Sequence, residues 1–122
     1  MLYLERKFDI RCFMLGVEVG NHLKFFWYEE GYIRTASEKF SLKKVSKSIH
    51  LTNEAIQKNM KNYGEHETAN KLSYNEIDKY FLNNTTFNFT QEVLPEMKRI
   101  ARDICHAVGD TGRIGGGSGL SF

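Results

Sequence analysis

Two strand-forming runs separated by a turn signal constrain the fold of this chain more than any other feature. Phe8–Val19 is a long, largely apolar run rich in aromatic and β-branched residues, and Leu23–Tyr28 (LKFFWY) is a second aromatic run. Between them lies Gly20-Asn21, a pair typical of tight turns. The pattern predicts two antiparallel strands. It also predicts a third, short strand over Tyr32–Thr35 after a turn at Glu29–Gly31, so that the three form a β-meander.

The remainder of the folded part predicts an irregular segment followed by two helices. Ser37–Ser48 is rich in Lys and Ser and is typical of a surface loop, and Asn53–Asn70 is polar without a clear period, as in functional or disordered stretches. Ser73, with Glu76 three residues later, forms a capping-box pattern that starts a helix reaching about Phe81. The second helix begins near Leu94 and carries one packing stripe: Leu94, Met97, Ala101, Ile104 and Val108.

Composition indicates one globular intracellular domain. The chain has 122 residues, of which 41% are hydrophobic, and its net charge of only +2 argues weakly for a polyanionic partner such as nucleic acid. Cys12 and Cys105 are far apart and show no metal-type spacing, so we expect both to stay reduced and we assign no metal ligand. The longest apolar run, Cys12–Val17, is too short to cross a membrane.

The chain divides into a folded part, residues 1–108, and a Gly-rich tail, residues 109–122. The tail contains Gly115–Gly117 and has no packing residue before Leu120. It does not match a phosphate-binding loop, because no Gly-Lys-Ser/Thr sequence follows the glycines. We therefore expect the tail to be disordered.

The beginning of the first predicted strand carries alternating charges. Strand geometry places Lys7, Asp9 and Arg11 on one face, which becomes apolar beyond Arg11. These charges either point into a cleft or form cross-strand ion pairs at a solvated strand end, and the second arrangement is the more frequent one. If the third strand pairs back in the meander, Arg34 stands near Arg11, and two converging guanidinium groups favour a carboxylate or phosphate between them.

Five motifs occur in order along the chain: RKFDIR (Arg6–Arg11), EGYIRTASE (Glu30–Glu38), HLTN (His50–Asn53), IQK (Ile56–Lys58) and KNYGEHETAN (Lys61–Asn70). Together they resemble the tubulin–tyrosine ligase and ligase-like family over most of the chain, and the last of them is similar to tyrosine ligase itself. The resemblance implies an α+β fold that forms part of an ATP-grasp catalytic domain, with an antiparallel meander followed by a loop and two helices.

The resemblance also implies a reaction and its location. In this family ATP phosphorylates a carboxylate of tubulin, in the C-terminal tail, and the amine of an amino acid displaces the phosphate to form an amide, with Mg²⁺ as cofactor. Tyrosine is the first expectation for the amino acid. The alternatives are a polyglutamylase or polyglycylase fragment and a non-catalytic module that binds the tubulin tail. The resemblance places the protein in the cytoplasm, at microtubules or cilia.

Because the family's Mg²⁺ ligands lie in a segment without a counterpart here, we expect this chain alone to be inactive. By the same resemblance, Lys7 faces the purine and phosphates of the nucleotide, and Asp9 contacts its ribose or the bound amine. Thr52 and Asn53 are implied to add neutral hydrogen bonds in the same pocket. Taken alone, without the other motifs, these two residues are more typical of a tight turn capped by the Thr and Asn side chains.

The two arginines are the expected catalytic residues. The resemblance implies that Arg11 and Arg34 hold the acceptor carboxylate or its acyl phosphate, and that His50 contacts the tubulin tail. Four lysines of the following loop either attract an acidic tail over long range or are simply solvated: Lys39, Lys43, Lys44 and Lys47.

Overall fold

The structure is a computed structural model that describes residues 1–20 and 22–110. Its elements follow in the order β1 (Arg6–Val19), β2 (His22–Lys39), α1 (Lys47–His50), α2 (Glu54–Gln57), η1 (Thr68–Asn70), β3 (Lys71–Ser73), α3 (Tyr74–Asn84), η2 (Phe89–Val93) and α4 (Leu94–Asp110). The predicted α+β class is confirmed. Most of the predicted tail, residues 111–122, lies outside the described residues, and α4 includes the first two residues of that tail.

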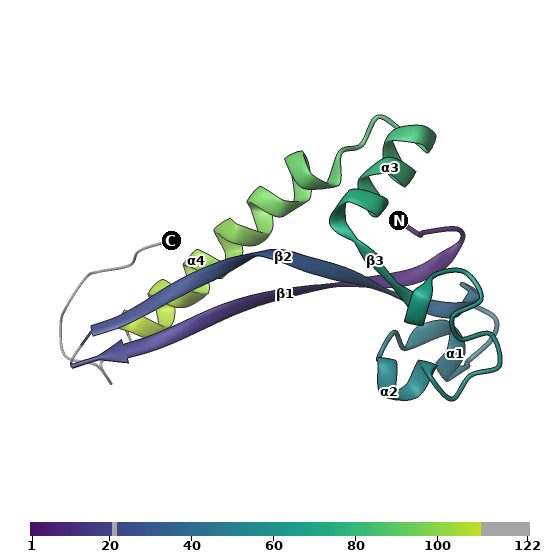
Figure 1. The fold of residues 1–122 in the computed structure, drawn as a ribbon, viewed down its shortest axis with the longest axis horizontal. Coiled ribbons are helices and arrows are strands. Elements are labelled where there is room, and N and C mark those ends of the chain that lie inside the picture. The colour runs from purple at the N-terminus through teal and green to yellow at the C-terminus, as the bar shows by residue number, and fades with distance from the viewer. Residues whose placement is uncertain (21, 111–122) are drawn as a thin grey trace.

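The sheet is a long antiparallel hairpin with a short third strand. β1 pairs with β2 from Val19↔His22 at the turn to Arg6↔Lys39 at the open end, and Gly20 next to the turn has a φ of +60°, which glycine adopts without strain. β3 pairs only with Tyr32–Arg34 on the other edge of β2, so the strand order is β1-β2-β3. Figure 1 shows the hairpin as an extended arm, with α4 lying along it and with α1 and α2 at the opposite end.

The predicted turn at Glu29–Gly31 is wrong, because β2 runs straight through it. Between the pairs Arg11↔Tyr32 and Phe13↔Tyr28, β1 advances by two residues and β2 by four, so this segment is a bulge in a continuous strand. Glycine and charged residues suit a bulge as well as a turn, which explains the error. The third strand of the meander therefore comes from Lys71–Ser73 and not from the residues after the bulge.

Gly31 in the bulge is covered by a tyrosine. The hydroxyl of Tyr74, the first residue of α3, donates a hydrogen bond to the Arg11 carbonyl oxygen across a distance of 3.1 Å. A Cβ atom at Gly31 would approach both the Tyr74 hydroxyl oxygen and the Arg11 carbonyl oxygen to well under 3.0 Å. The bulge, the helix start and the first strand therefore meet at a position where only glycine fits.

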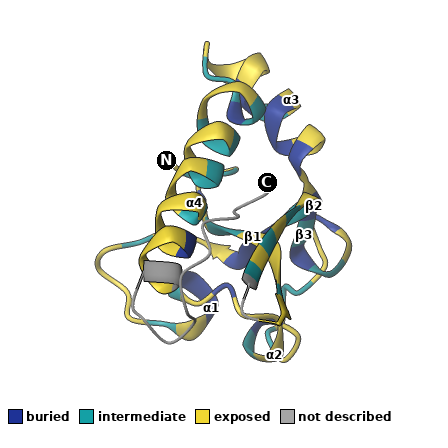
Figure 2. Ribbon diagram, turned by 90° about the vertical axis from the view of Figure 1, so that its left-hand side faces the viewer, coloured by how far each residue is buried: buried dark blue, intermediate teal, exposed yellow. Residues whose placement is uncertain are grey.

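One face of the sheet builds the core. Phe8 and Ile10 of β1 pack against a buried cluster, as the predicted alternation requires. The cluster joins β2, β3, α3 and η2: Ile33, Leu72, Tyr74, Ile77, Phe81 and Phe89. Figure 2 shows buried positions in α3, in the adjoining sheet and in α1, whereas α4 is intermediate or exposed over most of its length.

Both predicted helices are present, and one detail of their packing differs from the prediction. The Ser73–Glu76 capping box forms in both directions, and α3 extends to Asn84, beyond the predicted end at Phe81. In α4 the predicted stripe holds at its start, but Ile104 is 55% exposed and the buried residue is its neighbour Cys105. Val108, the last residue of the predicted stripe, is likewise exposed.

The cause is a contact that the periodicity does not reveal. Cys105 Sγ lies 3.4 Å from Met14 Sδ of β1, so the helix face that meets the hairpin arm passes through Cys105.

Cys12 and Cys105 are both free cysteines. None of the helices within the described ranges, 1–20 and 22–110, has the length and apolar character needed to cross a membrane.

The segment predicted to be irregular is folded around a buried ion pair. Arg6 is 1% exposed and Glu67 is 8% exposed, and the guanidinium meets both carboxylate oxygens, one of them at 3.1 Å from Nη1. Arg6 Nη1 also donates to the Ala36 carbonyl oxygen at 3.1 Å, and the Thr35 hydroxyl donates to Glu67 Oε2 at 2.9 Å. The pair therefore fixes residue 67 against the beginning of β1 and the last part of β2.

Buried amide side chains extend this network. Asn70 Nδ2 donates to the Thr35 carbonyl oxygen at 3.2 Å and to Ser37 Oγ at 3.0 Å, while its Oδ1 accepts from the Gly64 amide at 2.8 Å. Gln57 Oε1 accepts from the Ser37 amide at 2.9 Å. A segment that looks irregular in sequence is thus held by polar contacts between residues far apart in the chain, which a periodicity analysis cannot detect.

We predict that Glu67→Gln destabilises the chain strongly. The substitution keeps the shape of the side chain but leaves the Arg6 guanidinium as an uncompensated buried charge, which costs about 3–5 kcal/mol in other proteins. Urea unfolding measures the change. Glu96→Gln, which breaks the exposed pair with Arg99, is the matched control and should change little. An equally small effect of Glu67→Gln would contradict the assigned role of the pair.

Gly31→Ala should also lower stability, because the added methyl group must displace either the Tyr74 hydroxyl or the Arg11 carbonyl. Overpacking of this kind costs about 1–3 kcal/mol. Gly16→Ala is the control within the same hairpin, since its Cβ would meet only the Phe25 ring, at 3.2 Å. Thermal unfolding of both variants should show the larger loss for Gly31→Ala, and the reverse order would rule out the described bulge.

Candidate functional site

The sheet face opposite the core carries a group of charged residues in two rows. Directly paired residues of neighbouring strands point to the same side of a sheet. The register therefore places Asp9, Arg34 and Lys71 in one row across β1, β2 and β3, and Arg11 beside Tyr32 in the next row. We use the name charged cluster for the charged residues of these rows together with Lys7 of β1 and two residues from between β2 and β3. Its members are Lys7, Asp9, Arg11, Arg34, Thr52, Glu54 and Lys71.

Asp9 lies at the centre of the charged cluster. Arg34 grips its carboxylate with two parallel hydrogen bonds, Nε to Oδ1 and Nη2 to Oδ2, both of 2.7 Å. The hydroxyl of Thr52, which is itself buried, donates to Asp9 Oδ2. Burial raises the pKa of Asp9, but the hydrogen bonds from Arg34 and Thr52 and the charges of Arg34 and Arg11 outweigh it, so the pKa lies below its ordinary value.

The turn that contains His50, Thr52 and Asn53 contacts β1 at two points. One is the Thr52 hydroxyl, and the other is the His50 carbonyl oxygen, which accepts from Lys7 Nζ at 2.9 Å. The His50 ring points elsewhere, with Nε2 at 2.7 Å from the Lys44 carbonyl oxygen. Asn53 is exposed and makes no side-chain capping bond at the start of α2, so the turn is not closed by the caps that its sequence also allowed.

Arg11 differs from Arg34 in its surroundings. Its side chain is exposed, and Cζ lies 5.5 Å from the centre of the Phe13 ring. Among the described residues its guanidinium has no hydrogen bond or ion pair, although its charge lowers the pKa of Asp9. Arg34 thus forms the cross-strand ion pair that was one of the two sequence-based alternatives, and Arg11 lies diagonally from it on the same face with its donors available.

Two members of the charged cluster were not anticipated from sequence. Lys71 Nζ lies 2.8 Å from the Glu54 carboxylate and 5.4 Å from the centre of the Tyr32 ring. The hydrogen bond between Lys71 and Glu54 raises the pKa of Lys71 and lowers the pKa of Glu54. Only the strand register brings Lys71 beside Arg34, and the register depends on the long-range contacts of β3. No local signal marks either residue.

The charge balance of this face suits an anion. The charged cluster contains four cationic side chains and two carboxylates, and Arg11 and Lys7 keep donors that the carboxylates do not use. Phosphate and carboxylate oxygens match such donors. A divalent metal does not fit equally well, because the residues that the structure describes contain no group of three or more His, Cys, Asp or Glu side chains able to hold one.

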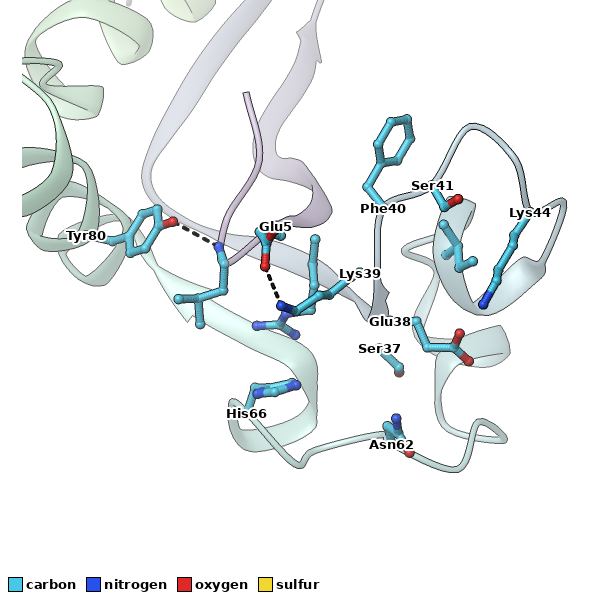
Figure 3. Close-up of a pocket in the computed structure, with 13 residues that line it drawn as sticks. Glu5, Ser37, Glu38, Lys39, Phe40, Ser41, Lys44, Asn62, His66 and Tyr80 are labelled. Atoms are coloured by element: carbon cyan, nitrogen blue, oxygen red, sulfur yellow. Dashed lines mark hydrogen bonds and ion pairs between the residues drawn. The ribbon is translucent and has the colours of Figure 1, made fainter.

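A separate pocket of about 900 Å³ lies near the open end of the hairpin (Figure 3). Leu4, Phe40, Ile49 and Tyr80 supply apolar walls, and Lys39 and Lys44 lie at its edge, Lys39 paired with Glu5. Its lining therefore includes two of the four loop lysines but takes in none of the charged cluster, which lies on the open face of the sheet.

The lowered pKa of Asp9 predicts a specific dependence of stability on pH. A carboxyl with a lowered pKa in the folded state stabilises that state fully above the pKa of the unfolded chain, ordinarily 3.8, and the contribution is lost as the pH falls through the folded value. We therefore expect Asp9→Asn to flatten the decrease in unfolding free energy below pH 3.8, as measured by urea unfolding. Equal slopes in variant and wild type would contradict the described ion pair.

Comparison with known proteins identifies relatives of the chain. Tubulin glycylase 3D of Tetrahymena thermophila is 30% identical over 107 residues, which cover 84% of this chain and 10% of that protein. A protein monoglycylase of Mus musculus is 44% identical over 62 residues, and a tubulin monoglycylase of Homo sapiens is 40% identical over 62 residues. Each of these two matches covers 51% of this chain and less than a tenth of the relative.

The chain thus spans a tenth or less of the length of these relatives. The model of the tubulin-tyrosine ligase family matches residues 1–111, which include every strand and helix of the structure and all of the charged cluster. The match covers far more than half of the sequence, so the chain belongs to the tubulin-tyrosine ligase family.

Proposed function

We propose that this chain forms part of the catalytic face of an ATP-dependent ligase that joins an amino acid to a carboxylate of the tubulin C-terminal tail. The charged cluster is the observation that carries the proposal. It offers a sheet face with an excess of cationic side chains, and it contains residues from three of the five sequence motifs. Chemistry that passes through phosphoryl and tetrahedral oxygens depends mainly on such prearranged donors.

The proposed roles follow from the surroundings of each side chain. Arg11, with free donors at the edge of the charged cluster, binds the acceptor carboxylate or its acyl phosphate. Arg34 contributes a second guanidinium to the same anion while it holds Asp9. Lys7, which donates to the His50 carbonyl oxygen, and Thr52, in the same turn as His50, provide a charge and a hydroxyl for the nucleotide, with Asn53 next to Thr52.

Glycine is the amino acid that we favour over tyrosine. The relatives described above are named as glycylases, and this supports glycine over the tyrosine expected from the sequence motifs. ATP supplies the phosphoryl group that activates the carboxylate. Since the described residues do not form a metal site, we propose that this chain alone has no ligase activity. Incorporation of labelled glycine and not tyrosine into tubulin, by a longer protein that contains this chain, would identify the amino acid.

Binding measurements on the 122-residue chain test the proposal. We expect calorimetric titration to detect both ATP and a glutamate-rich peptide, and Arg11→Ala to weaken peptide binding by about tenfold or more, because a hydrogen bond to a charged group contributes about 1.5–3 kcal/mol. Arg99→Ala removes an exposed arginine of α4 and is the matched control.

The two ligands separate the functional alternatives. Peptide binding without ATP binding would support a non-catalytic module for the tubulin tail in place of a ligase. Unchanged peptide affinity in Arg11→Ala would exclude Arg11 from the site, and the absence of binding to either ligand would contradict both functions.

A further inference from the structure

Gln57 occupies a buried position behind the charged cluster. It is the last residue of α2, is 0% exposed and uses both ends of its amide. Oε1 accepts from the amide of Ser37 at 2.9 Å and from the Ser37 hydroxyl. Nε2 donates to the carbonyl oxygens of Lys47, Ser48 and Leu51, the first two at 3.3 and 3.4 Å. One side chain therefore joins β2 to the short helix α1.

These carbonyl groups belong to a helix end that needs partners. The last carbonyl groups of a helix accept no hydrogen bond from within the helix. Helix α1 has only four residues, Lys47–His50, with Leu51 as its C-cap. A buried helix end without partners is destabilised. Gln57 supplies a donor to the Ser48 and Leu51 carbonyls and a second one to the Lys47 carbonyl, which also accepts from the Leu51 amide at 3.1 Å. These bonds fix the backbone on both sides of His50.

The fixed backbone is the one that reaches the charged cluster. The His50 carbonyl oxygen accepts from Lys7, and the Thr52 hydroxyl donates to Asp9. Leu51, whose carbonyl group is bonded to Gln57, lies between these two residues in the chain. The other end of Gln57 is held by Ser37, on the same strand as Arg34. The amide thus spans from β2 to the turn that faces β1.

We propose that Gln57 is a positioning residue for the charged cluster: it holds the turn at residues 50–52 so that Thr52 and the His50 carbonyl meet Asp9 and Lys7. Its importance for catalysis rests on the function proposed above, but its effect on the geometry of the cluster does not. The side chain of Gln57 bonds only to Ser37, Lys47, Ser48 and Leu51 among the described residues, none of which is assigned to nucleotide or acceptor, so the side chain acts through the turn. The backbone amide of Gln57 donates to the Asn53 carbonyl oxygen, a bond that does not depend on the side chain.

The ionisation of Asp9 provides a readout that a merely space-filling residue would not change. The hydrogen bond from Thr52 is one of the contacts that lower the pKa of Asp9. Nuclear magnetic resonance titration of the Asp9 carboxyl in the whole chain therefore reports whether the turn is in place, without any nucleotide or tubulin. Thr52→Val, which removes only the hydroxyl, sets the size of the upward shift caused by losing this bond.

We expect Gln57→Ala to raise the pKa of Asp9 by an amount comparable to Thr52→Val, since the turn is released in the first variant and its hydroxyl removed in the second. Gln57→Met fills the same space without hydrogen-bonding groups and serves if Gln57→Ala fails to fold. Ile77→Val, in the core of α3, is the control for a general loss of stability and should leave Asp9 unchanged.

An unchanged pKa of Asp9 in both Gln57 variants, with the expected shift in Thr52→Val, would show that Gln57 only fills space. No shift in Thr52→Val would also overturn the proposal, because the contact that Gln57 is said to position would then not exist. Failure of the proposed ligase function would leave all of these shifts in place, so the two ideas are tested separately.

Discussion

Arg6 and Glu67, which lie 61 positions apart in the chain, form an ion pair that is almost completely buried. Burying two charges is costly, and the cost is offset only when the remaining donors and acceptors are satisfied. Here Ala36 and Thr35 provide partners, while Arg6 Nε, among the described residues, has none. The polar segment from residue 53 to residue 70 has little apolar surface, so its position depends on this pair and on the amide network beside it.

The geometry of the charged cluster depends on the same contacts. Arg6 points inward at the first position of β1, and strand alternation therefore turns Lys7 and Asp9 to the two positions where the turn before α2 can reach them. The ordered segment in turn carries Lys71 into register with Arg34. A buried polar network on one side of the sheet thus determines the spacing of charges on the other side.

Local sequence patterns predicted the features that depend on residues close together in the chain. Alternation in β1 placed Phe8 and Ile10 in the core and Asp9 on the opposite face, and the Ser73–Glu76 pair predicted the start of α3. The bulge at Glu29–Gly31 was predicted as a turn, because the two share their composition. Glu67, Gln57 and Lys71 were missed, since their partners are distant in the chain and only the folded register brings them together.

Amide hydrogen exchange of the 122-residue chain tests the central claim most directly. The amide of Gly64, in the segment without long regular structure, donates to the Asn70 side chain at 2.8 Å, and the amide of Ser37, in β2, donates to the Gln57 side chain at 2.9 Å. If the buried pair and its network fold this segment, both amides exchange far more slowly than in an unstructured peptide, and Glu67→Gln removes that protection. Exchange at the unstructured rate in the wild-type chain would contradict the account.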